Sequence, residues 1–193
     1  MKISAILLDF YGVLYSNFDW KVIDKRIYSD KEKAAEFVSL KRLSNEGRLS
    51  DDEFRDSVTK LANDEKHPNE PAVLSHPICN NHLIESIRQL LPDVKLALLS
   101  NGNQANIEAL MKQGEIHSHF DLIATSSQTH LFKPQLVAFN YVYDKLGIEP
   151  KQGVLIDDSP THVQGARSHG LTAIQYSENS TTIAELEKLL QKQ

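Results

Sequence analysis

Five short apolar runs are spaced along the chain, and each is followed by polar or turn-forming residues. The runs cover residues 3–8, 94–100, 121–126, 153–158 and 171–176. They are continuous rather than alternating between apolar and polar positions, which is typical of strands buried on both faces of a parallel sheet. The pattern therefore predicts five buried strands.

Helix-length stretches lie between and after these runs. Residues 82–91 place five leucine and isoleucine side chains on one stripe, and the tail at 181–193 places four at helical spacing. Residues 134–146 begin with a proline and are followed by Gly147, the usual order at the two ends of a helix. Strands that alternate with helices predict an α/β fold, here a Rossmann-like central parallel sheet flanked by helices.

The stretch from about residue 16 to residue 76 interrupts this alternation. It contains no comparable apolar run and is rich in Lys, Glu, Asp and Ser, so we interpret it as helical. Ser50 and Glu53 have the spacing of a capping box at the start of one helix. Gly47 has the position of a left-handed residue that ends a preceding helix over about residues 31–44.

We therefore expect two structural units. A small all-helical cap at residues 16–76 is inserted after the first strand, and residues 1–15 and 77–193 form the α/β core. The segment 67–77 contains three prolines and is expected to be the linker that returns to the core. Four aromatic residues of the insertion are expected either to line a pocket or to pack the core of the cap: Phe18, Trp20, Tyr28 and Phe54.

Composition narrows the class of protein. The chain has 193 residues, of which 40% are hydrophobic, which fits one core domain with an insertion and excludes global disorder. Its net charge is −5 without a basic block, so we expect no nucleic-acid partner.

The single cysteine, Cys79, cannot form an internal disulfide, and no apolar stretch approaches the roughly 20 residues that cross a bilayer. We expect a cytoplasmic protein without a membrane partner, present as a monomer or weak homodimer.

Polar residues follow the predicted strands at the edge where ligands bind in open parallel sheets. Asp9 follows the first strand, residues 100–103 follow the second, and Asp157 and Asp158 follow the fourth. Lys133 precedes the helix that leads to that fourth strand. Carboxylates that converge with one lysine suit a hard cation such as Mg²⁺ beside a cluster of anionic oxygens.

Taken one at a time, these residues also have ordinary structural explanations. Ser100, Asn103 or Ser159 would suit the capping position of a helix, and Lys133 would suit the protein surface. Asp9 is harder to explain in this way, since an acid that ends a buried apolar run either loses hydration at a cost or uses its charge. The combination of residues favours a functional site.

Four segments carry these residues: LLDFYGVL at 7–14, LLSNGN at 98–103, HLFKPQ at 130–135 and LIDDSPTHVQGARSHG at 155–170. In this order and spacing they resemble the four motifs of the haloacid dehalogenase superfamily of hydrolases, along nearly the whole chain. The helical insertion lies where members with a small helical cap carry theirs. These motifs are specific for the superfamily, but they give little information about the substrate.

The resemblance implies a covalent, metal-assisted mechanism. Asp9 would attack the phosphorus of a small phosphorylated metabolite and form an aspartyl-phosphate. Mg²⁺ would be held by Asp9, by the backbone carbonyl of Tyr11 and by Asp158, with Asp157 supporting the metal shell.

The resemblance also implies a set of phosphate-binding residues. Ser100 and the Asn101 amide, with Gly102, would hold the oxygens of the transferred group. Lys133 would offset the negative charge that the phosphate and the nucleophile share.

Tyr11 departs from the phosphatase pattern. Phosphatases of this superfamily usually carry a second aspartate two residues after the nucleophile, as acid for the leaving alcohol and base for the hydrolytic water. A phenol, with an ordinary pKa of about 10, suits that task poorly, and loss of a positioned acid typically costs about 10²–10⁴-fold in rate. This puts strong alkyl phosphatase activity in doubt.

Two alternatives to a phosphatase stay open. An Asp-x-Tyr first motif is also what haloacid dehalogenases show, where halide leaves without a proton. Their fourth motif, however, resembles Ser-Ser-Asn followed by an aspartate, and this chain has Asp157, Asp158 and Ser159, with His162 at the aspartate position. The second alternative is a catalytically impaired protein that binds a phosphorylated ligand or a partner without turnover.

Overall fold

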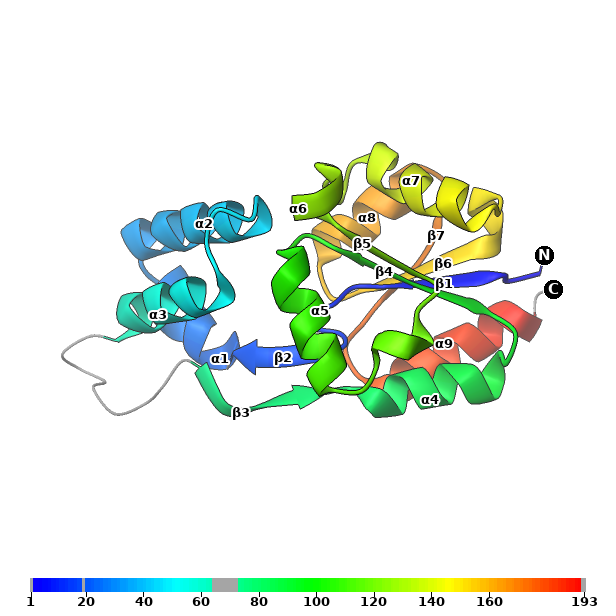
Figure 1. Ribbon diagram of the computed structural model, residues 1–193, viewed down its shortest axis with the longest axis horizontal. Coiled ribbons are helices and arrows are strands. Elements are labelled where there is room, and N and C mark those ends of the chain that lie inside the picture. Colours follow the sequence, from blue (N-terminus) through cyan, green and yellow to red (C-terminus); the bar gives the residue numbers. More distant parts are fainter. Residues whose placement is uncertain (1, 19, 64–72, 192–193) are drawn as a thin grey trace.

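The computed structural model describes residues 2–18, 20–63 and 73–191, and its centre is a five-stranded parallel sheet (Figure 1). The order across the sheet is β5-β4-β1-β6-β7. The strands are β1 (Ala5–Leu8), β4 (Lys95–Ser100), β5 (Leu122–Thr125), β6 (Gly153–Asp157) and β7 (Thr172–Gln175). All five predicted strands are confirmed, and the first strand in sequence lies at the centre of the sheet.

Helices cover both faces of this sheet (Figure 1). Apolar residues of α4 (Asn81–Leu90), α5 (Gln104–Gln113) and α9 (Asn179–Gln191) pack on one face with Ile6 and Leu8. Those of α7 (Leu136–Leu146) and α8 (Pro160–Ser168) pack on the other with Ala5 and Leu7. Alternate residues of β1 therefore enter two separate cores, which explains its continuous apolar sequence.

Short helical turns complete the core: η2 (His117–His119), α6 (Ser126–Thr129) and η3 (Pro150–Gln152). The longest helix among the described residues is α2 (Lys31–Asn45) in the insertion, with 15 residues. No described helix combines the length and apolar character needed to cross a membrane.

The insertion forms a second, smaller unit beside the carboxyl ends of the strands (Figure 1). It contains α1 (Trp20–Ile23), the π-helix η1 (Asp24–Tyr28), α2 and α3 (Asp51–Ala62). Its own apolar core is built from Ile23, Ile27, Phe37, Val58 and Ala62. The local predictions hold here: Ser50 and Glu53 form a capping box, and Gly47 has a φ of +75° just after α2.

The expectation of an all-helical cap does not hold at the boundary with the core, and residues 67–72 of the expected return linker lie outside the described residues. Strands β2 (Tyr15–Phe18) and β3 (Val73–Cys79) form an antiparallel pair that joins the two units. The expected boundaries, after residue 15 and before residue 77, fall inside this pair. Pairing satisfies the backbone hydrogen bonds of both crossing segments, although neither segment has the apolar run of a buried strand.

Candidate active site

The residues of the four motifs meet where the carboxyl edge of the sheet faces the insertion. Asp9 follows β1, Ser100 ends β4, Asp158 follows β6, and Lys133 lies ahead of α7. A cavity of about 320 Å³ opens at this edge. Core and insertion residues line it together: Asp9, Tyr11, Gly12, Tyr15, Tyr28, Lys41, Ser44, Asn45, Phe54, Ser100, Asn101, Asp158, Ser159 and His162.

Lys133 lies beneath this cavity and bridges two carboxylates. Its Nζ is 2.9 Å from Oδ1 of Asp9 and 2.5 Å from Oδ2 of Asp157, and its side chain is fully buried. Burial alone would lower the pKa of Lys133, but the charges of the two carboxylates outweigh it and raise that pKa. The surface interpretation of Lys133 is therefore wrong, and the ammonium is a fixed positive charge at the base of the site.

The side chain of Asn101 holds the backbone of Lys133 in place. Its Nδ2 donates to the Lys133 carbonyl and its Oδ1 accepts from the Lys133 N–H, both at 2.9 Å. This reciprocal pair ties the end of β4 to the segment before α7. The side-chain amide of Asn101 is thus engaged in positioning Lys133.

Ser100 carries a polar atom without a described partner. Its Oγ is buried and makes no hydrogen bond within the described part of the chain, and the residue lines the cavity. A buried hydroxyl normally finds a partner, so this one is placed to donate to a ligand oxygen. The capping interpretation is wrong for Ser100 and confirmed for Asn103 and Ser159, which cap α5 and α8.

Asp158 and Gly12 are in close contact across the site. Gly12 has a φ of +89°, and a Cβ added there would lie 2.2 Å from Oδ2 of Asp158. Only glycine allows the chain after β1 to approach this carboxylate so closely. Burial, together with the charges of Asp9 and Asp157, raises the pKa of Asp158 to about 6.

Asp9 and Asp157 differ in how their charges are compensated. Burial, and then the charge of Asp157, raises the pKa of Asp9, although Oδ1 accepts the Phe10 N–H at 2.7 Å. The pKa of Asp157 lies well below its usual range despite burial, because Lys133 and His162 both stabilise its anion. Asp157 is therefore fully engaged inside the protein, and Asp9 faces the cavity.

The donor set fits a hard divalent cation. Asp9, Asp157 and Asp158 place three carboxylates at this edge, and the pKa values of Asp9 and Asp158 are raised, first by burial and then by the charges of neighbouring carboxylates. Donor atoms of Asp9, Asp157 and His162 lie within 4.8 Å of one another. Asp157 contacts both Lys133 and His162, whereas Asp9 and Asp158 line the cavity, so these two are the candidate carboxylate ligands for Mg²⁺.

Sequence reasoning left some residues of the cavity without a role. His162 lies against Asp157, with its Nδ1 3.0 Å from Oδ1, and lines the cavity. Lys41, Ser44 and Asn45 line it from the last turns of α2, and their position ahead of the Gly47 turn is the one sequence feature that marks them. Of the expected phosphate-binding residues, Gly102 is buried, and a Cβ there would lie 3.4 Å from the Tyr11 ring.

Solved structures with this fold include a predicted hydrolase and a magnesium complex of an enzyme. A predicted HAD-like family hydrolase from Porphyromonas gingivalis covers all of both chains, with a TM-score of 0.68 and 23% identity. A HAD family enzyme from Bacteroides thetaiotaomicron, in complex with magnesium and inorganic phosphate, has a TM-score of 0.61 and 21% identity, covering 91% of this chain and 94% of that one. At these identities the likeness supports the fold.

Curated relatives of differing activity also match. Bifunctional epoxide hydrolase 2 of Mus musculus is 31% identical over 39% of this chain and 14% of its own length. Mouse N-acylneuraminate-9-phosphatase is 29% identical over 52% of this chain and 41% of its own. The (S)-2-haloacid dehalogenase of Pseudomonas putida is 23% identical over 82% of this chain and 77% of its own. The chain thus covers less than half of the length of the epoxide hydrolase and of the N-acylneuraminate-9-phosphatase.

A family model that matches most of the chain identifies the family. The model of the haloacid dehalogenase-like hydrolase family matches residues 30–176, which include most of the insertion and three of the four motifs. The first motif, at residues 7–14, precedes the matched range, and it contributes Asp9 at the centre of the same sheet. The chain belongs to the haloacid dehalogenase-like hydrolase family.

Proposed function

We propose that the protein is a Mg²⁺-dependent phosphatase that hydrolyses a small phosphorylated metabolite through an aspartyl-phosphate on Asp9. The observation that carries the proposal is the presence of a second, partly buried carboxylate, Asp158, in the same cavity as Asp9. Two facing carboxylates suit a divalent cation and its anionic ligand, and they repel a carboxylate substrate that binds without a metal. The phosphatase relative and the magnesium and phosphate complex of a family enzyme support the same choice.

In the first step, a carboxylate oxygen of Asp9 attacks phosphorus, and the bond from phosphorus to the leaving oxygen breaks. Lys133 holds Asp9 in place through a 2.9 Å ion pair, and its positive charge favours the anionic form of this carboxylate. The buried hydroxyl of Ser100 donates to an oxygen of the transferred group, whose charge rises in the transition state. In the second step, water displaces Asp9 from phosphorus and releases inorganic phosphate.

Asp9, Asp158 and the backbone carbonyl of Tyr11 would hold the Mg²⁺ ion. When bound, it would neutralise the negative charge of the nucleophile and of the phosphate. Asp157 supports this arrangement from below, because it is ionised and fixes both Lys133 and His162.

Dehalogenation is the second candidate, because Tyr11 stands where phosphatases have their acid. Tyr11 lines the cavity, and the dehalogenase relative from Pseudomonas putida matches most of the chain. In that reaction Asp9 would attack carbon and halide would leave. The partly buried carboxylate of Asp158 opposes it, since a haloacid brings a further negative charge to the same cavity.

Product release distinguishes these functions. The protein is incubated with small phosphomonoesters or with 2-haloacids, each with Mg²⁺ or with EDTA, and free phosphate and free halide are measured. We expect phosphate release that requires Mg²⁺ and is lost in Asp9→Asn. Halide release that persists in EDTA would replace the proposal with dehalogenation. Binding of phosphate without turnover of any substrate would identify a catalytically impaired protein.

A further inference from the structure

Aromatic rings form much of the cavity wall, and they come from both structural units. Tyr11 and Tyr15 line it from the core, and Tyr28 and Phe54 line it from the insertion. Each of these rings is fixed by a further ring behind the wall or beside it. The cavity therefore presents flat apolar surfaces around the nucleophile, in addition to its charged base.

On the core side, Phe10 organises the two tyrosines. It is fully buried, stacks on Tyr15 with ring centroids 5.4 Å apart, and meets Tyr11 edge to face at 4.9 Å. On the insertion side, the buried Phe37 has its centroid 5.6 Å from that of Tyr28 and 6.3 Å from that of Phe54. Rings held in this way recognise another ring with little loss of conformational entropy.

The volume of the cavity limits the size of its ligand. About 320 Å³ is at the lower end of the range of about 300–1,000 Å³ for small-molecule sites. That space suits a phosphate with one ring system. The tyrosine hydroxyls and the side chains of Ser44 and Asn45 add polar groups that can orient ring substituents.

Apart from the size of the cavity, the residue at position 11 limits which leaving groups the enzyme can expel. Tyr11 provides no carboxylic acid beside the leaving oxygen, so the proposed phosphatase would have to expel a group that departs as an anion. A phenolate, with an ordinary pKa of about 10, departs far more readily than an alkoxide, whose pKa is near the roughly 15.7 of water. A substrate whose phosphate is carried on an aromatic hydroxyl therefore avoids the need for the missing acid.

We propose, on the basis of the phosphatase function above, that the substrate is an aryl phosphate, a monoester of a phenolic or heteroaromatic hydroxyl. Asp9 forms the bond to phosphorus, and the aryl oxygen leaves with the bonding electron pair as a phenolate. Water then attacks phosphorus, the carboxylate of Asp9 regains its electron pair, and the protons of the water leave with phosphate and solvent. The ring lies against Tyr28 and Phe54 throughout the first step.

Four substrates separate the leaving group from the ring. Phenyl phosphate has a ring and a good leaving group, acetyl phosphate has only the good leaving group, benzyl phosphate has only the ring, and ethyl phosphate has neither. With Mg²⁺, we expect kcat for the two poor leaving groups to be about 10²–10⁴-fold lower than for the two good ones. The Tyr11→Asp variant should recover most of this difference, with kcat for benzyl and ethyl phosphate raised far more than kcat for phenyl phosphate.

Ring recognition is tested separately through KM. Tyr28→Leu and Phe54→Leu should each raise KM for phenyl phosphate about three- to tenfold more than they raise KM for acetyl phosphate. Tyr141→Leu removes a half-buried ring outside the cavity and serves as the matched control, with no expected change. Circular dichroism verifies that each variant is folded.

The outcomes distinguish this inference from the function on which it rests. No hydrolysis of any of the four phosphates would overturn the phosphatase function itself. Equal kcat for ethyl and phenyl phosphate would leave the phosphatase intact and overturn the aryl preference, since another proton donor such as His162 would then serve the leaving group. Unchanged KM for phenyl phosphate in both insertion variants would overturn the role of the ring wall.

Discussion

Replacing Asp158 by Asn should stabilise the metal-free protein at neutral pH. Burial, and then the charges of Asp9 and Asp157, raises the pKa of Asp158 from 3.8 to about 6. The folded protein therefore favours the neutral acid, and ionising it costs stability as the pH rises from about 4 to about 6. A shift of about two pKa units corresponds to about 3 kcal/mol, and partial solvent screening reduces the expected gain to about 1–3 kcal/mol at pH 7.

Urea unfolding in EDTA measures this gain. The Asp158→Asn variant should be more stable than the parent at pH 7 and equally stable at pH 4, where the parent carboxyl is protonated and matches the amide in charge. Asp93→Asn, in the exposed turn after α4, is the matched control, and its stability should change by less than about 0.5 kcal/mol at both pH values.

Magnesium should offset the stability advantage of the variant over the parent. An ion that binds only the folded state adds about 2.7 kcal/mol of stability at a concentration of 100 times its Kd, and we expect this gain in the parent and its loss in the variant. Lower stability of the variant than of the parent at pH 7 in EDTA would refute the assignment of uncompensated charge to Asp158. Equal stabilisation of both by Mg²⁺ would refute its place among the metal ligands.

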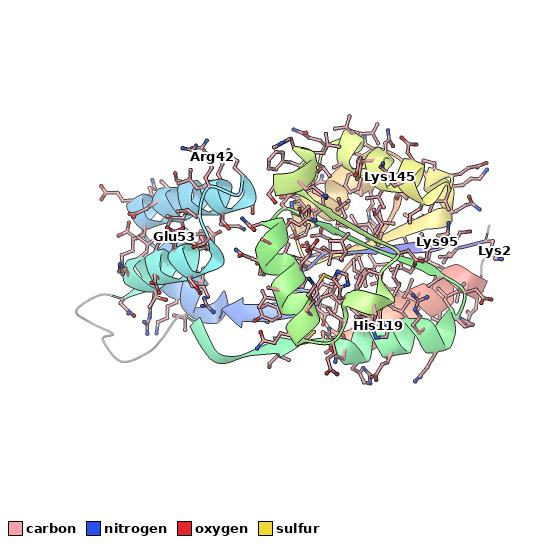
Figure 2. The ribbon with its side chains drawn as sticks, in the orientation of Figure 1. Lys2, Arg42, Glu53, Lys95, His119 and Lys145 are labelled. Atoms are coloured by element: carbon pink, nitrogen blue, oxygen red, sulfur yellow. The ribbon has the colours of Figure 1, made fainter. Side chains whose placement is uncertain are left out.

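Three further substitutions test other parts of the site. Asp9→Asn should reduce release of phosphate, or of halide, by at least about 10³-fold in steady-state assays, because both candidate reactions need its nucleophilic oxygen. Lys133→Met should lower the free energy of unfolding by about 3–5 kcal/mol in urea, since two buried carboxylates lose their partner. By contrast, Lys95→Met, which loses one hydrogen bond to a carbonyl far from the insertion (Figure 2), should cost about 1 kcal/mol. Gly12→Ala should weaken Mg²⁺ binding in calorimetry and destabilise the fold by about 1–3 kcal/mol, because its Cβ would displace Asp158.

The strands and most helices of the core were predictable because their signals are local. A continuous apolar run such as residues 94–100 becomes a strand with both faces covered, and only the ends of the run shift by a residue. The capping box at Ser50, ahead of Glu53 on the insertion (Figure 2), is also contained within four residues. Such elements need no knowledge of distant partners.

The β2 and β3 pair could not be predicted in this way. The segment at Tyr15–Phe18 has no apolar run of its own, and its partner at Val73–Cys79 follows almost 60 residues later. Its register also shifts between Ser16 and Phe18, so no regular alternation marks the pairing. The strands exist because the chain must leave and re-enter the core at adjacent points, a constraint of topology and not of local sequence.

For the candidate site, the sequence identifies the residues but does not show which of them contact one another. Motif order identifies Asp9, Lys133 and the Asp157–Asp158 pair as residues of one edge, but it does not say which carboxylate the lysine compensates. The geometry assigns Lys133 to Asp9 and Asp157, and His162 adds a second partner for Asp157. The pKa of the partly buried Asp158 rises because of its burial and because of the charges of Asp9 and Asp157, and the charge of a divalent cation is best matched there. The arrangement of the cluster, more than the presence of its residues, is therefore what favours metal-dependent phosphate chemistry over metal-free attack on a haloacid.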